Sequence, residues 1–137
     1  MTELNIELNE LSFKPGDELT GSVEWICDKA PQKMELRLFW FTRGKGTEDV
    51  GVVETVRFEQ PQLNETRKFR LRLPDSPYSF SGRLVSLIWA LELVAEPAKQ
   101  AKRLEIVMGP EGQEVRLDNL PELPGENKGR KLFAWNR

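Results

Sequence analysis

Apolar and polar residues alternate along most of residues 4–108, with the period of two that is typical of β-strands. Leu4, Ile6 and Leu8, for example, alternate with polar neighbours at the start of the chain. No stretch combines helical spacing with a cap at both ends. The alternation predicts strands over residues 4–8, 19–27, 34–41, 50–59, 67–73, 84–94 and 104–108, with Val52, Val56 and Phe58 on one side of the strand over 50–59.

Turn-forming residues separate the predicted strands. Pro15 presets φ and Gly16 accommodates the tight turn between the first two of them. Glycines predict a hairpin loop over 43–49, and prolines predict connections at 61–64 and 74–77. Residues 97–103 are long enough for one helical turn. Regular strands spaced by turns predict an all-β fold, an immunoglobulin-like two-sheet sandwich.

The large aromatic residues fall on both faces of the predicted strands. Trp25, Trp40 and Trp89 lie on the apolar faces and are expected to fill the core, as is the inward-facing Cys27. Phe39 and Phe41 point away from the face of Trp40, so this strand is either covered on both sides or exposes an apolar patch for a partner. We favour cover by the C-terminal tail or by a second subunit, with side chains such as those of Leu132, Phe133 and Trp135.

A row of basic residues follows the outward face of the strand predicted over 67–73. Lys68, Arg70 and Arg72 alternate there with the inward-facing Phe69 and Leu71. Such a row is most often a solvated surface that resists aggregation. The other interpretation is an electrostatic patch for an acidic partner.

Composition narrows the chemistry that the chain can perform. The 137 residues contain no histidine and a single cysteine, so a Ser-His-Asp or Cys-His site and an internal disulfide are excluded. Twenty basic and 22 acidic residues give a net charge of −2, which provides no general attraction to nucleic acid. We expect no cofactor and no metal site, and the chain is not expected to be an enzyme.

The chain also lacks the sequence signals of export and of membrane insertion. The longest apolar stretch, residues 84–95, is about a dozen residues, whereas a membrane-spanning helix needs roughly 20. The first residues show neither the basic nor the apolar region of a secretory signal. We therefore expect a cytoplasmic protein.

Three segments, taken in order, resemble an arrestin-type domain, as found in arrestins and in the retromer and sporulation-control proteins. Each segment places a turn or an aromatic strand where that family has one. The first holds Phe13, Pro15, Gly16, Asp17, Gly21 and Val23; the second runs from Phe69 to Pro74 and on through Pro77, Ser79, Phe80 and Gly82; the third is Leu87 to Leu93. The resemblance covers residues 4–108 and implies a scaffold that binds proteins.

The chain departs from that family in two respects. Arrestins pair two such sandwiches, and this chain has the length for one, so a homodimer could recreate the pair. Phosphate-sensing arrestins carry a basic pair in the first strand, where this chain is acidic and polar from Glu3 to Glu10. A receptor-phosphate sensor is therefore not supported.

These observations divide the chain into two parts. Residues 1–108 are expected to form the sandwich. Residues 109–137 form a Pro/Gly-rich extension, in which 115–117 could make a short edge strand, docked on the sandwich or on a partner. We expect a non-catalytic protein-interaction or scaffold module, whose partner the sequence does not name. The candidate contact residues are Phe39, Phe41, Lys68, Arg70, Arg72, Phe133 and Trp135.

Two alternatives stay open. A membrane-associated adaptor would use the basic aromatic end of the tail, where Lys128, Arg130, Lys131 and Arg137 lie beside Phe133. A small-ligand carrier or enzyme would need a concave pocket with converging polar groups.

Overall fold

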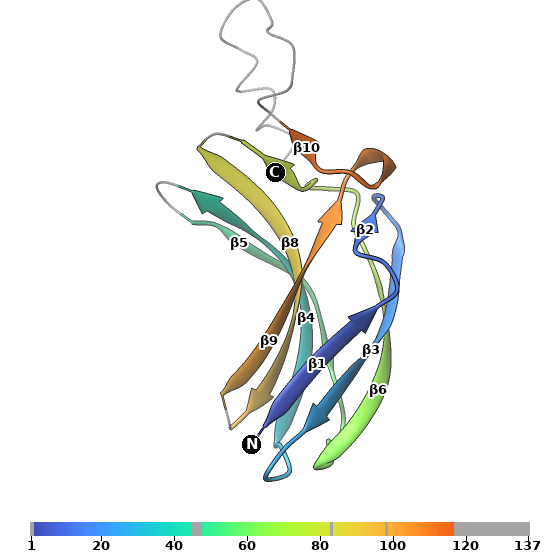
Figure 1. Ribbon diagram of the computed structural model, residues 1–137, viewed down its shortest axis with the longest axis vertical. Coiled ribbons are helices and arrows are strands. Elements are labelled where there is room, and N and C mark those ends of the chain that lie inside the picture. The colour runs from blue at the N-terminus through green and yellow to red at the C-terminus, as the bar shows by residue number, and fades with distance from the viewer. Residues whose placement is uncertain (1, 45–47, 83, 98, 117–137) are drawn as a thin grey trace, which may run out of the picture.

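The computed structural model describes residues 2–44, 48–82, 84–97 and 99–116. Within them the chain forms ten β-strands and one 3₁₀ turn (Figure 1). The strands are β1 (Glu3–Leu8), β2 (Ser12–Phe13), β3 (Glu18–Ile26), β4 (Lys33–Gly44), β5 (Val50–Arg57), β6 (Asn64–Arg72), β7 (Phe80–Ser81), β8 (Val85–Glu96), β9 (Gln100–Met108) and β10 (Val115–Arg116), and the turn, η1, is Pro110–Gly112.

The strands form two sheets. The smaller sheet has the order β1-β3-β6, with both pairs antiparallel. The larger sheet has the order β10-β7-β8-β4-β5, and β9 joins it by pairing with β8 and with β2. Its centre is the antiparallel pair of β4 and β8, which runs from Lys33 opposite Glu96 to Gly44 opposite Val85. The fold is therefore an all-β sandwich, as the alternation predicted.

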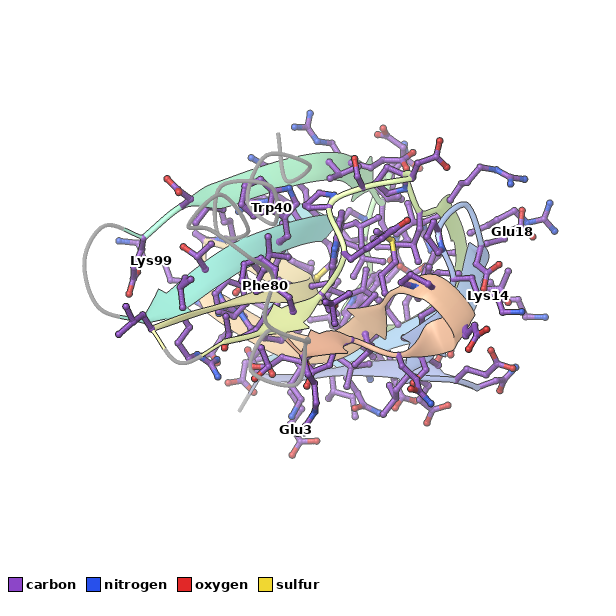
Figure 2. The ribbon with its side chains drawn as sticks, turned by 90° about the horizontal axis from the view of Figure 1, so that it is seen from above. Glu3, Lys14, Glu18, Trp40, Phe80 and Lys99 are labelled. Carbon is purple, nitrogen blue, oxygen red and sulfur yellow. The ribbon has the colours of Figure 1, made fainter. Side chains whose placement is uncertain are left out.

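The core lies between the two sheets, where side chains from both layers meet (Figure 2). Trp25 of the smaller sheet and Trp89 of the larger sheet are completely buried. Each indole N–H donates to a backbone carbonyl, Trp25 to Gln62 at 2.8 Å and Trp89 to Pro77 at 2.7 Å. A buried indole needs such an acceptor, so these two bonds satisfy the polar atoms of the two largest buried side chains and tie them to the neighbouring backbone.

Two glycines allow backbone geometry that a residue with a side chain would disfavour. Gly16 has φ +81°, and the N–H of Asp17 donates to the carbonyl of Lys14 at 3.0 Å, which closes the turn. Gly21 pairs with Leu8 on one side and Phe69 on the other, and a Cβ on Gly21 would collide with the carbonyl oxygen of Glu7. The missing side chain therefore lets β1 approach β3 closely.

The structure differs from the sequence prediction in four places. Cys27 was expected in the core and is partly exposed. Residues 100–103 belong to β9 instead of a helical turn. Val52 does not share a face with Val56, because a β-bulge shifts the β4–β5 register between Leu38 and Phe39. The two-residue strands β2 and β7 were not predicted; they are too short to show an alternation.

Candidate functional site

The first candidate surface lies on the face of the larger sheet that points away from the core. Phe39 pairs with Val52, and Phe41 pairs with Val50 on one side and with Ile88 on the other. Cross-strand partners share a face, so these five side chains form one apolar surface, which we call the outer aromatic face. The rings of Phe39 and Phe41 stack with their centroids 5.8 Å apart.

The β-bulge creates part of this surface. Leu38 pairs with Glu54, and the next residue, Phe39, pairs with Val52, so Val53 is the extra residue of β5. The extra residue turns Val50 and Val52 onto the side of the two phenylalanines. Simple alternation places Val52 with Val56 on the opposite face, which is why sequence reasoning missed it.

Two arginines cover the aromatic rings. The guanidinium of Arg103 lies 5.0 Å from the ring centre of Phe39 and 4.9 Å from that of Phe41, and Arg43 lies 5.4 Å from Phe41. Arg103 pairs with Glu92 at 3.3 Å, and Arg43 pairs with Glu105 at 3.1 Å. The positive charges over the rings are thus balanced within the sheet.

The arginines leave the valines uncovered. Phe39 is 5% exposed, whereas Val50 is 63% and Val52 is 58% exposed. A shallow groove of about 240 Å³ runs beside them, bordered by Glu48 of the preceding loop and by Arg37. A partner can therefore bury valine side chains here without displacing the arginines.

A buried carboxylate borders this face. Glu35 is 4% exposed and accepts hydrogen bonds from Arg57 at 2.9 and 3.1 Å and from Arg37 at 3.2 Å, with Lys33 at 3.5 Å. Burial pushes the pKa of Glu35 upward, but the hydrogen bonds and the neighbouring positive charges outweigh it, so the pKa lies below its ordinary value. The hydrogen bonds of Arg57 to Glu35 join β5 to β4 at the end of the candidate face. Sequence reasoning missed this cluster.

The second candidate surface is the basic row on the outer face of the smaller sheet. Arg70 pairs with Glu18 at 3.7 Å, and Arg72 donates to the carbonyl of Gly16 at 3.0 Å. Lys68 makes no ion pair with the residues described. Two of the three basic residues thus contact β3 and the turn that precedes it.

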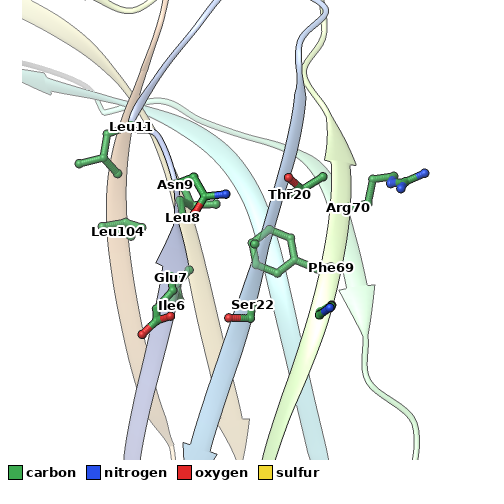
Figure 3. A pocket seen from close by; sticks show the side chains of 12 residues that line it. Ile6, Glu7, Leu8, Asn9, Leu11, Thr20, Ser22, Phe69, Arg70 and Leu104 are labelled. Atoms are coloured by element: carbon green, nitrogen blue, oxygen red, sulfur yellow. The ribbon is translucent and has the colours of Figure 1, made fainter.

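A groove of about 840 Å³ runs over β1, β3 and β6 and reaches Leu104 of β9 (Figure 3). Its floor is β3, where Thr20, Gly21 and Ser22 carry short side chains or none. Glu7 of β1 borders it on one side, and Lys68 and Arg70 of β6 border it on the other. The groove is open and bears opposite charges on its two sides, so it does not favour one sign of ligand.

The described residues contain no group of three or more His, Cys, Asp or Glu that could hold a metal ion. Cys27 follows β3 and is partly exposed, and burial is the main reason that its pKa is raised. A raised pKa keeps sulfur as the thiol, the less reactive form. No helix in this part of the chain has the length and apolar character to cross a bilayer.

Two of the predicted contact residues, Phe133 and Trp135, lie outside the described residues, as do Leu132 and the basic residues of the tail. The expectation that the tail docks on the sandwich therefore stays a prediction, and so does the membrane-associated alternative. The structure places Phe39 and Phe41 together on one outer face, and Lys68, Arg70 and Arg72 together on the other.

Comparison with solved structures identifies the architecture. The crystal structure of Spo0M, a sporulation control protein from Bacillus subtilis, superimposes with a TM-score of 0.58 and 19% sequence identity over 80% of this chain. The chain has the arrestin-like fold. It spans about half, 49%, of the Spo0M chain. No protein-family profile and no curated protein matches the sequence.

The two candidate surfaces lie on different sheets of the arrestin-like sandwich. The outer aromatic face belongs to the larger sheet and the basic row to the smaller one, so the two surfaces lie on opposite sides of the sandwich. A likeness at 19% identity shows the fold alone. The function must therefore be argued from these surfaces.

Proposed function

We propose that this arrestin-like sandwich is a non-catalytic protein-interaction module and that the outer aromatic face is its docking surface. The supporting observation is the pair of exposed valines, Val50 and Val52, beside two stacked phenylalanines on one sheet face. Contiguous apolar surface rimmed by charged groups is a recurrent feature of protein-binding sites. Arg37, Arg103 and Glu48 supply that rim.

The structure favours docking on the face over strand addition at the edge. β5 is the last strand of the larger sheet, and its outer edge would be the place for an added strand. The bulge at Val53 interrupts the regular ladder in the middle of β5, and such bulges protect edges from further pairing. A partner would therefore fill the groove with side chains and leave the backbone of β5 unpaired.

The comparison supports the fold on which this proposal is built and does not by itself assign a role. The similar solved chain is a sporulation control protein, and it is about twice as long as this chain. The partner of this chain is proposed only as a protein that presents apolar or aromatic side chains to the groove.

Affinity capture from the native host tests the proposal. The bait is the full chain, compared with Val52→Lys on the face and with Ile26→Lys as the control, since Ile26 is a 47% exposed strand residue of the smaller sheet. We expect at least one captured protein to be lost with Val52→Lys and retained with Ile26→Lys. The same set of captured proteins from all three baits would contradict the proposal.

A further inference from the structure

The groove of the outer aromatic face is lined by an acidic side chain that has no ion pair among the residues described. Arg103 and Arg43 are each paired with a glutamate of the sheet. Glu48, which precedes β5, lines the groove and makes no ion pair with the residues described. The surface therefore fits a segment that combines apolar side chains with positive charge.

The chain itself carries such a segment. Residues 128–137 include four basic residues and no acid, together with Leu132, Phe133 and Trp135. The aromatic side chains match the exposed valines of the groove, and the basic side chains match Glu48. No other run of ten residues in the sequence joins four bases, no acid and two aromatic residues.

The described part of the chain ends on the larger sheet, three strands away from Arg43. In the register of the larger sheet, Arg116 pairs with Ser81, Ser81 with Ser86, and Ser86 with Arg43. Neighbouring strands are about 4.8 Å apart, so Arg116 lies roughly 14 Å from the backbone of Arg43. Arg43 contacts Phe41, a member of the outer aromatic face.

The remaining chain is long enough to cover this distance. Residues 117–137 number 21, and an extended chain spans about 3.3 Å per residue, so they reach up to about 70 Å. Residues 128–137 can therefore reach the groove of their own molecule, and a second copy is not required.

We propose that residues 128–137 occupy the groove of the outer aromatic face in the same molecule, and that an external partner must displace them. This inference rests on the proposed function, because it takes the same face as the docking surface. A tethered segment competes with an external partner for the groove at an effective concentration on the order of millimolar. Partners that bind the groove weakly would therefore not displace it.

Photo-crosslinking in the full chain tests the location. A benzophenone analogue of phenylalanine replaces Val52, and the same analogue at Ile26 is the control. We expect crosslinks from position 52 to residues 128–137 in a product of monomer mass, and none from position 26. Crosslinks only in a product of dimer mass would assign the segment to a second copy and overturn the proposal. Absence of tail crosslinks, or equal crosslinks from position 26, would also overturn it.

Peptide binding tests the competition. A fluorescent peptide of residues 126–137 is titrated with the full wild-type chain and with the Phe133→Ala, Trp135→Ala double variant. We expect at least about tenfold tighter binding to the double variant, because its own segment no longer competes. Adding Val52→Lys to the double variant should remove that gain. Equal binding to the wild type and the double variant contradicts an occupied groove.

The two proposals can fail separately. If crosslinks to the tail are absent and Val52→Lys still loses a captured protein, the face is a docking surface and the tail does not occupy it. If the crosslinks are present and Val52→Lys loses no captured protein, the face binds only the tail, and the proposed function is wrong.

Discussion

The guanidinium of Arg103 lies 5.0 Å from the ring centre of Phe39, and this contact joins β9 to β4 across β8, which lies between them. The same guanidinium reaches Phe41. One side chain from a strand that pairs with neither β4 nor β5 thus covers the aromatic part of the outer face. The side chain that covers the two rings therefore belongs to the larger sheet itself. Replacing Arg103 should change the stability of the chain by a measurable amount.

Arg103→Ala should destabilise the chain and expose both rings. Loss of a cation–π contact at a partly exposed site costs about 0.5–1 kcal/mol, and the aliphatic stem of Arg103 adds a packing loss. Urea unfolding monitored by circular dichroism gives the change in the free energy of unfolding. Arg70→Ala, which removes only an exposed 3.7 Å ion pair, is the control. Equal losses in the two variants would show that the ring contact does not contribute.

Gly21→Ala should cost more stability than Gly16→Ala, although Gly16 has the positive φ. A Cβ on Gly16 meets only Asp75 at 3.8 Å, so the cost there is the left-handed conformation, about 1–2 kcal/mol. A Cβ on Gly21 collides with the backbone of Glu7, which can relax only if β1 moves away. Thermal unfolding of the two variants compares them directly. A smaller loss for Gly21→Ala would show that β1 shifts without cost.

Glu35 should make the stability of the chain depend on pH in the acid range. The pKa of Glu35 is lowered in the folded chain from an ordinary value of 4.5, because the hydrogen bonds from Arg57 and Arg37 and the nearby positive charges outweigh burial. Its ion pairs therefore stabilise the fold fully above that value, and this stability is lost as the pH falls through the lowered pKa.

Urea unfolding between pH 7 and pH 3 measures this dependence. The free energy of unfolding should fall less steeply with decreasing pH in Glu35→Gln than in the wild type. Some dependence should remain in the variant, since the pKa of Glu65 is also lowered, by the hydrogen bond from the backbone of Gln62 and by Arg67. Identical slopes in the variant and the wild type would exclude Glu35 as a source.

The basic row should behave as solvated surface. Lys68→Glu changes a side chain without an ion pair among the residues described, so the free energy of unfolding should change by less than about 0.5 kcal/mol. The proteins captured from the host should be the same as with the wild type. Loss of a captured protein with Lys68→Glu would move the docking surface to the groove of the smaller sheet.

The alternation of side chains was sufficient to predict the sandwich. Leu19, Val23 and Trp25 are buried as their spacing required, and the turn at Pro15 and Gly16 forms as expected. These features are local, and local sequence encodes them.

The composition of the outer face could not be predicted in the same way. A bulge breaks the period of two, so Val52 was assigned to the wrong face. Arg103 belongs to a segment that was long enough for a helical turn, and nothing in its neighbours places it over Phe39. The grouping of Arg57, Arg37 and Lys33 around Glu35 depends on the pairing of β4 with β5. Alternation within one strand does not predict which residues of two strands lie opposite each other.

The pairing of β4 with β8 has a consequence for biosynthesis. It joins residues 33–44 to residues 85–96, so the central ladder of the larger sheet cannot close until the ribosome has released most of the chain. Until then the apolar side chains of Leu36, Leu38 and Phe39 have no partner strand on that side, and a nascent chain in this state is prone to association. Chaperone binding during synthesis should therefore concentrate on the segment around β4.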